Sequence, residues 1–97
     1  MDTKLPLSLK DYSGLEGEPF SVTGPGTLIE ARLIETKAMG QGLRDGGAFA
    51  LLWQGPAAPA LVQATYQVMH EATGPQDIFL VPVTKNDEGF CYEAVFT

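Results

Sequence analysis

Few side chains in this sequence could carry out catalytic chemistry, and the most reactive are His70 and Cys91, the only histidine and the only cysteine. His70 could form an acid–base pair with Glu71 or Asp77, which lie close to it in the sequence. A histidine at the end of a strand is, however, more often a surface or capping residue. Cys91 lies within an apolar run, where a thiol is usually unreactive. A Cys91 nucleophile with His70 as its base has no supporting local motif, and we expect no enzyme activity.

The sequence also predicts no metal and no cofactor. One histidine and one cysteine cannot form the usual zinc ligand sets within a chain. The glycine-rich segment 40–47 lacks the Lys-Ser/Thr pair of a phosphate-binding loop. Segment 86–89, Asn-Asp-Glu-Gly, is too short for a calcium loop and is typical of a polar hairpin turn. We therefore expect these residues to shape the backbone.

The clearest structural pattern is the last third of the chain, residues 77–97. Two runs of β-branched and aromatic residues flank a polar cluster ending at Gly89, which predicts a C-terminal β-hairpin with a loop of several residues. In the second run the aromatic residues alternate, which predicts that they share the buried face. The residues of this face are Phe90, Tyr92, Ala94 and Phe96.

Two predicted strands, residues 48–53 and 77–83, are apolar on both faces. In the second of them, Ile78 and Leu80 oppose Phe79, Val81 and Val83. An antiparallel strand normally leaves one face polar. The second face must therefore be covered by closure of the sheet, by another segment or by a neighbouring subunit.

The whole chain, residues 1–97, is predicted to form a single domain. Its N-terminal segment, residues 1–17, contains a short helix that begins after Ser8, although residues 4–8 could equally form a leading strand. Glycine and proline recur between short apolar runs, which favours strands over helices. Further strands are expected at 19–22, 27–36 and 64–69, with a long loop at 37–47 and a turn at Gly74-Pro75. The expected fold is all-β, a small antiparallel β-barrel or sandwich of about six or seven short strands with one short N-terminal helix.

Charge and hydropathy limit the classes of partner. The net charge of −6 argues against nucleic acids and anionic membranes, which bind basic surfaces. No apolar run reaches membrane-spanning length and no signal peptide is recognised, so we expect no membrane insertion. The single cysteine allows no internal disulfide. We predict that the protein is cytoplasmic when synthesised, with later incorporation into an assembled particle left open.

The residues best suited to contact a protein partner are aromatic or lie in the doubly apolar strand. Pro82 cannot donate a hydrogen bond to a sheet, which indicates that its strand ends there or lies at an edge, and an apolar edge favours pairing with another chain. We therefore expect a protein partner or a homo-oligomer. The predicted interface residues are Trp53, Tyr66, Ile78, Leu80, Pro82, Phe90 and Tyr92.

Several motifs together resemble one uncharacterised family of small bacterial domains. Its members carry a Pro-Phe-Ser-Leu-x-Phe-x-Gly-Pro run, a Leu-Pro-Gln-Gly-x-Tyr run and a Phe-Leu-Val-Pro-Val run followed by Tyr-Glu-Ala-Val-Phe-Asn. The corresponding residues here are Phe49, Leu51 and Gly55-Pro56, then Leu61, Gln63 and Tyr66, then 79–83 and 92–96. This chain departs from the pattern at Ala48, Trp53, Ala64 and Thr97. The resemblance implies no activity, but it implies a genomic setting near phage tail-collar-like proteins.

Two hypotheses follow from these observations. The first is a non-enzymatic protein-interaction module, a structural or accessory assembly subunit of a phage-tail-like or fibre-like assembly. The alternative is a small β-barrel that binds an apolar or flat ligand between its strands, with Trp53 and Tyr66 lining the site.

Overall fold

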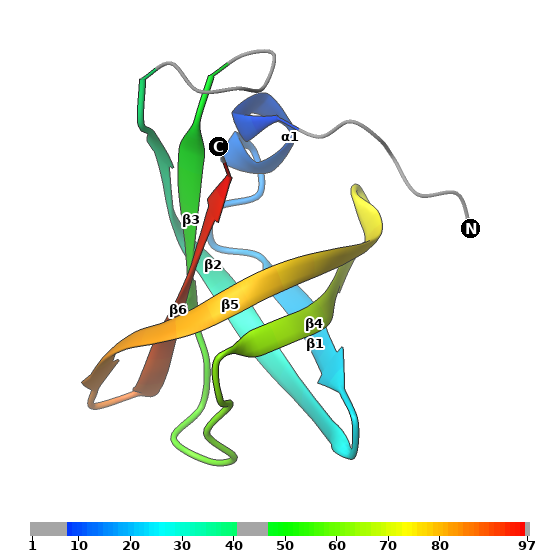
Figure 1. Ribbon diagram of the computed structural model, residues 1–97, viewed down its shortest axis with the longest axis vertical. Helices are drawn as coiled ribbons and strands as arrows, with labels where there is room; N and C mark the ends of the chain where they lie inside the picture. The colour runs from blue at the N-terminus through cyan, green and yellow to red at the C-terminus, as the bar shows by residue number, and fades with distance from the viewer. Residues whose placement is uncertain (1–7, 41–46, 97) are drawn as a thin grey trace.

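The chain forms a closed antiparallel β-barrel with one short helix (Figure 1). The computed structural model describes residues 8–40 and 47–96, and within them the strands follow the order β1-β2-β3-β6-β5-β4 around the barrel. The predicted all-β fold is thus confirmed as a barrel of six strands. The elements are α1 (Leu9–Ser13), β1 (Pro19–Gly24), β2 (Thr27–Ala38), β3 (Phe49–Gln54), β4 (Ala64–His70), β5 (Gly74–Asn86) and β6 (Gly89–Phe96).

Helix α1 begins and ends where the sequence indicates. The Asp11 carboxylate accepts a hydrogen bond from the Ser8 backbone N–H at 2.8 Å, and Gly14 is the C-cap. The one large side chain that α1 buries is Tyr12, whose ring lies 6.3 Å from Phe20 and 6.4 Å from Trp53. The helix therefore packs against the aromatic end of the barrel core, beside the end of β6 (Figure 1). The alternative leading strand falls almost entirely outside the described residues.

The barrel interior is filled by every second residue of the strands, as the period of two requires. In the doubly apolar β3 the outward Ala50 is buried as well, and its paired neighbours are Lys37 of β2 and Val95 of β6. The core residues from the strands include Phe20, Val22, Ile29, Leu33, Phe49, Leu51, Trp53, Tyr66, Val68, Ile78, Leu80, Tyr92 and Ala94.

Two predicted turns are shorter than the sequence suggests. β5 continues to Asn86, which pairs with Gly89, so the hairpin turn consists of residues 87 and 88 alone. The Asn86 side-chain oxygen accepts the backbone N–H groups of Glu88 (2.9 Å) and Gly89 (3.1 Å), which stabilises this tight turn. Gly74 and Pro75 likewise begin β5, and the turn before them is 71–73. Of the predicted loop 37–47, residues 37 and 38 belong to β2, and residues 41–46 lie outside the described part of the chain.

Strand β5 changes its neighbour half-way along its length. Residues 74–80 pair with β4, and residues 81–86 pair with β6 around a bulge between Pro82 and Thr84. Pro82 therefore lies just beyond the last residue paired with β4. This position agrees with the expectation that Pro82 marks a sheet edge, because a proline lacks the N–H that a second neighbouring strand would use.

Candidate functional site

Most of the predicted interface residues lie inside the barrel. Trp53, Tyr66, Ile78, Leu80 and Tyr92 are buried in the core. Their side chains are therefore unavailable to a partner of the folded domain, which corrects this part of the predicted surface. The physical reason is that closure of the barrel turns one face of each strand inward, and these five side chains lie on that face. The remaining two are accessible to different degrees: Pro82 is exposed, and Phe90 is half-buried with the Lys85 ammonium 5.3 Å from its ring centre.

Two of these buried residues hold the connection between β3 and β4. The Tyr92 hydroxyl accepts the backbone N–H of Leu61 at 2.8 Å, and the Tyr66 hydroxyl donates to the carbonyl of Val62 at 2.7 Å. Leu61 is itself buried and belongs to the core cluster. The tyrosines thus fix a loop against the barrel, which is a structural role.

Part of the accessible apolar surface comes from the opposite faces of strands β5 and β6, and further exposed apolar side chains lie elsewhere at Leu28, Ile34, Met39 and Val62. Phe79, Val83 and Val95 are 51%, 48% and 50% exposed, and the outward Val81 of β5 is half-buried. We call these four residues the outer β5–β6 face. Val81 pairs with Glu93, so Val95, two residues further along β6, lies diagonal to it. The doubly apolar pattern of residues 77–83 was the signal for this surface, although the sequence alone did not tell which face would lie inside.

His70 meets a carboxylate that its neighbours in sequence did not suggest. Its Nε2 lies 2.7 Å from Oε1 of Glu18, 52 positions earlier in the chain, and its Nδ1 accepts the backbone N–H of Ala72 at 2.9 Å. The ring packs on Phe20 with 4.8 Å between centroids. Neither Glu71 nor Asp77 is the hydrogen-bonded partner of His70. Both ring nitrogens of His70 are therefore hydrogen-bonded within the protein.

The His70–Glu18 pair lies in a surface hollow of about 590 Å³. Ser21 and Met69 form a cross-strand pair there, at the contact of β1 with β4. The hollow is lined by Glu18, Pro19, Ser21, Met69, His70 and Glu71.

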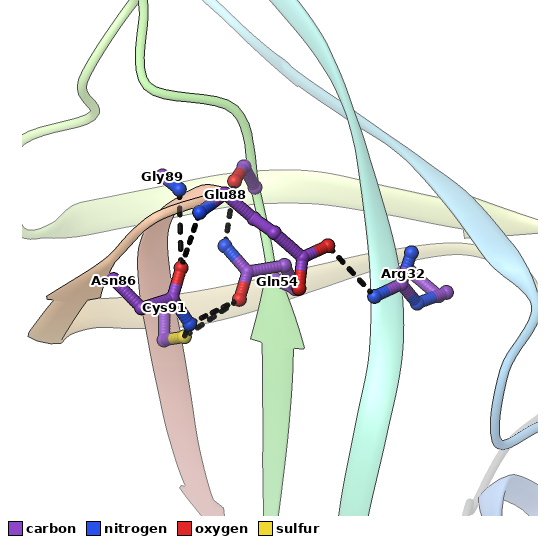
Figure 2. Close-up of polar contacts among 7 residues, drawn as sticks. Arg32, Gln54, Asn86, Glu88, Gly89 and Cys91 are labelled. Carbon is purple, nitrogen blue, oxygen red and sulfur yellow. Dashed lines mark hydrogen bonds and ion pairs between the residues drawn. The ribbon is translucent and has the colours of Figure 1, made fainter.

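Cys91, which is buried, belongs to a separate, partly buried polar cluster under the β5–β6 turn (Figure 2). Its thiol donates to Oε1 of Gln54 at 3.2 Å, and Nδ2 of Asn86 donates to the same oxygen at 2.7 Å. Burial raises the pKa of the Cys91 thiol above its ordinary value of 9.0. The negative charge of Glu88 adds to this rise, and a hydrogen bond from Asn86 opposes it. A thiol with a raised pKa is a poor nucleophile at neutral pH, so the cluster is suited to a structural role.

Comparison with known protein families gives a match over nearly the whole chain. A family model described as a domain of unknown function, DUF6916, matches residues 7–96. The chain belongs to the DUF6916 family. No curated protein and no solved structure shows a significant match to it. The expected relationship to an uncharacterised domain family is therefore confirmed.

The DUF6916 barrel shows no arrangement typical of a metal centre in its described residues. Among them, no group of three or more His, Cys, Asp or Glu side chains is placed to hold a metal ion. The helix within residues 8–40 and 47–96 is too short to cross a membrane. Residues 41–46 of the glycine-rich segment lie outside the described chain. Within the described residues, the outer β5–β6 face and the His70 hollow are the surface features considered below for a functional role.

Proposed function

We propose that this DUF6916 domain is a non-enzymatic protein-interaction module, a structural or accessory subunit of a phage-tail-like or fibre-like assembly. The observation that carries the proposal is the outer β5–β6 face. Three of its apolar side chains, Phe79, Val83 and Val95, are each about half exposed. Apolar residues that gather on one face often mark a contact with another protein.

The size of this face favours an assembly with repeated contacts. Full burial of a valine or phenylalanine side chain stabilises by about 1.5–3 kcal/mol, so covering the exposed halves of three such side chains contributes roughly 3 kcal/mol. Association itself costs roughly 4–15 kcal/mol in lost freedom of motion. This face alone would therefore give only weak pairing. Repetition of the same contact around a ring or along a fibre raises the overall affinity without new interactions.

The contact is expected through the face of the sheet, because the free edge of β5 is poorly suited to strand addition. Residues 81–86 have one neighbouring strand, β6, within the described chain. Pro82 lacks an N–H, Lys85 is charged, and the bulge distorts the backbone between Pro82 and Thr84. All three features disfavour edge-to-edge pairing.

The proposal is tested by light scattering after size-exclusion chromatography, together with affinity purification from the native host. We expect concentration-dependent oligomers, or co-purification of tail-like or fibre-like proteins. Phe79→Ser should weaken either contact at least tenfold. The matched control is Leu28→Ser, since Leu28 is an exposed apolar residue of β2 outside the outer β5–β6 face. Two results together would contradict the proposal. The protein would be a monomer at all concentrations, and the wild type and Phe79→Ser would co-purify with the same proteins.

A second candidate, binding of a flat apolar ligand, is supported by one observation. The indole N–H of Trp53 is buried and has no hydrogen-bond partner among the described residues. A ligand with an acceptor atom could bond to it, although Phe20 (5.6 Å) and Tyr12 (6.4 Å) pack around that ring. Trp53 is the only tryptophan, so its fluorescence reports this site directly. Saturable quenching by anilinonaphthalene sulfonate that persists in Phe79→Ser is the expected result, and unchanged Trp53 emission would rule this candidate out.

A further inference from the structure

The turn between β4 and β5 is built on the neutral form of His70. Nδ1 accepts the Ala72 N–H at 2.9 Å, so this nitrogen carries no proton of its own. The ring proton is therefore on Nε2, from which it is donated to Oε1 of Glu18 at 2.7 Å. Both hydrogen bonds fit one tautomer only.

The groups around His70 tolerate a positive charge. Glu18, from the segment before β1, and Glu71, from the turn, line the same hollow as His70. β1 contributes the neutral residues Phe20, Pro19 and Ser21, and β5 contributes Gly74, which pairs with His70. No lysine or arginine lines the hollow within the described residues. An imidazolium would therefore keep a charge-assisted hydrogen bond to Glu18.

Protonation of His70 keeps the contact with Glu18 but breaks the hydrogen bond that holds the turn. A proton on Nδ1 removes the acceptor of the Ala72 N–H and places two N–H groups against each other. Thr73 is held independently of the ring, because its backbone N–H donates to the His70 carbonyl at 3.2 Å and its hydroxyl to that of Gly74 at 2.9 Å. The loss is thus confined to residues 71 and 72.

We propose that the 71–73 turn is a pH-responsive element. Acidification protonates His70, keeps the contact with Glu18 and releases the Ala72 amide. Because Glu71 precedes Ala72 and lines the hollow, this release changes the shape of the hollow at that side.

Amide hydrogen exchange followed by NMR tests the proposal on the intact chain. After correction for the intrinsic pH dependence of exchange, protection of Ala72 should fall roughly 3- to 10-fold as the single histidine titrates. The amides of Gln67 and Val68 in β4 should keep their protection. Ring ¹⁵N shifts of the neutral form should show the proton on Nε2. A neutral ring protonated on Nδ1, or unchanged Ala72 protection through the titration, would overturn the inference.

His70→Asn is the matched control. An asparagine oxygen can accept the N–H two residues further on, as in an Asx turn, but the side chain does not titrate. Ala72 should therefore remain protected at every pH in this variant. The same fall in protection in His70→Asn would refute the role of the imidazole. If the variant does not fold, the wild-type measurements decide the question on their own.

Discussion

Replacing Tyr92 by phenylalanine should destabilise the barrel because it leaves a buried donor without a partner. The Tyr92 hydroxyl accepts the Leu61 N–H at 2.8 Å, and this hydrogen bond is buried. A phenylalanine ring would fill the same space at this position, so the change isolates the hydroxyl group. Leaving a buried N–H unpaired costs about 1–3 kcal/mol, and we expect the free energy of unfolding to fall by about 2 kcal/mol.

Tyr66→Phe provides the matched comparison in the same loop. The Tyr66 hydroxyl donates to the Val62 carbonyl at 2.7 Å, but this bond is only partly buried and the Val62 residue is 73% exposed. Water can then satisfy the carbonyl, and the expected loss is about 0.5–1 kcal/mol.

Urea denaturation followed by circular dichroism measures both values. The slope with denaturant should stay constant, because neither change alters the surface exposed on unfolding. Equal losses for the two variants, or a loss below about 0.5 kcal/mol for Tyr92→Phe, would refute the reasoning that Tyr92 acts through the buried Leu61 amide.

Three further predictions concern the β5–β6 turn. Gly89→Ala should lower the free energy of unfolding by about 3 kcal/mol in a denaturation experiment, because Gly89 has φ 139° and a Cβ there would collide with the backbone of Pro56 and Ala57. As the control, Gly14→Ala should change stability by less than about 0.5 kcal/mol, because a Cβ at Gly14 would meet no atom within 4 Å. Asn86→Ala should cost about 1–2 kcal/mol, since the Glu88 and Gly89 N–H groups lose their acceptor and Gln54 loses the Nδ2 donor. Asn86→Asp keeps the acceptor of the turn but also loses this donor, so it should recover only part of the loss, and equal losses for the two variants would count against the acceptor role in the turn. The raised pKa of Cys91 means that the native state favours the neutral thiol, so the contribution of this thiol to stability is complete below pH 9 and is lost as the pH rises through the native pKa. In a series of denaturation curves at increasing pH, Cys91→Ser should therefore lose less stability than the wild type. Identical curves for the two proteins would argue against a role of the thiol.

The sequence was sufficient for the fold class and for most elements. Alternation with a period of two located the strands, and the Ser8 to Asp11 spacing located α1, because these signals depend only on neighbouring residues. The sequence was less successful at predicting where the strands begin and end. Asn86 and Gly74 read as loop residues, yet the pairing of β5 with β6 and β4 draws both into the strand.

The candidate surface could be predicted only in part. The apolar character of both faces of residues 77–83 was visible in the sequence. Barrel closure buries one of these faces, whereas Phe79 and Val83 on the other are about half exposed, so the expected cover of that face remains a prediction. Which face became the interior was not visible. Ile78 and Leu80 were expected at an interface and lie in the core, whereas Phe79 and Val83 lie outside, because the direction of β5 follows from its register with β4 and β6.

By itself, the sequence determined that this chain forms an all-β fold from short strands, since backbone preference and the alternation of apolar residues are local properties. Only the tertiary structure decided which distant groups meet. The pairing of β1 with β4 brings His70 to Glu18, and the closed barrel brings Tyr92 to Leu61. Such contacts depend on strand order and register around the barrel, which arise from packing of the whole core rather than from any single stretch of residues.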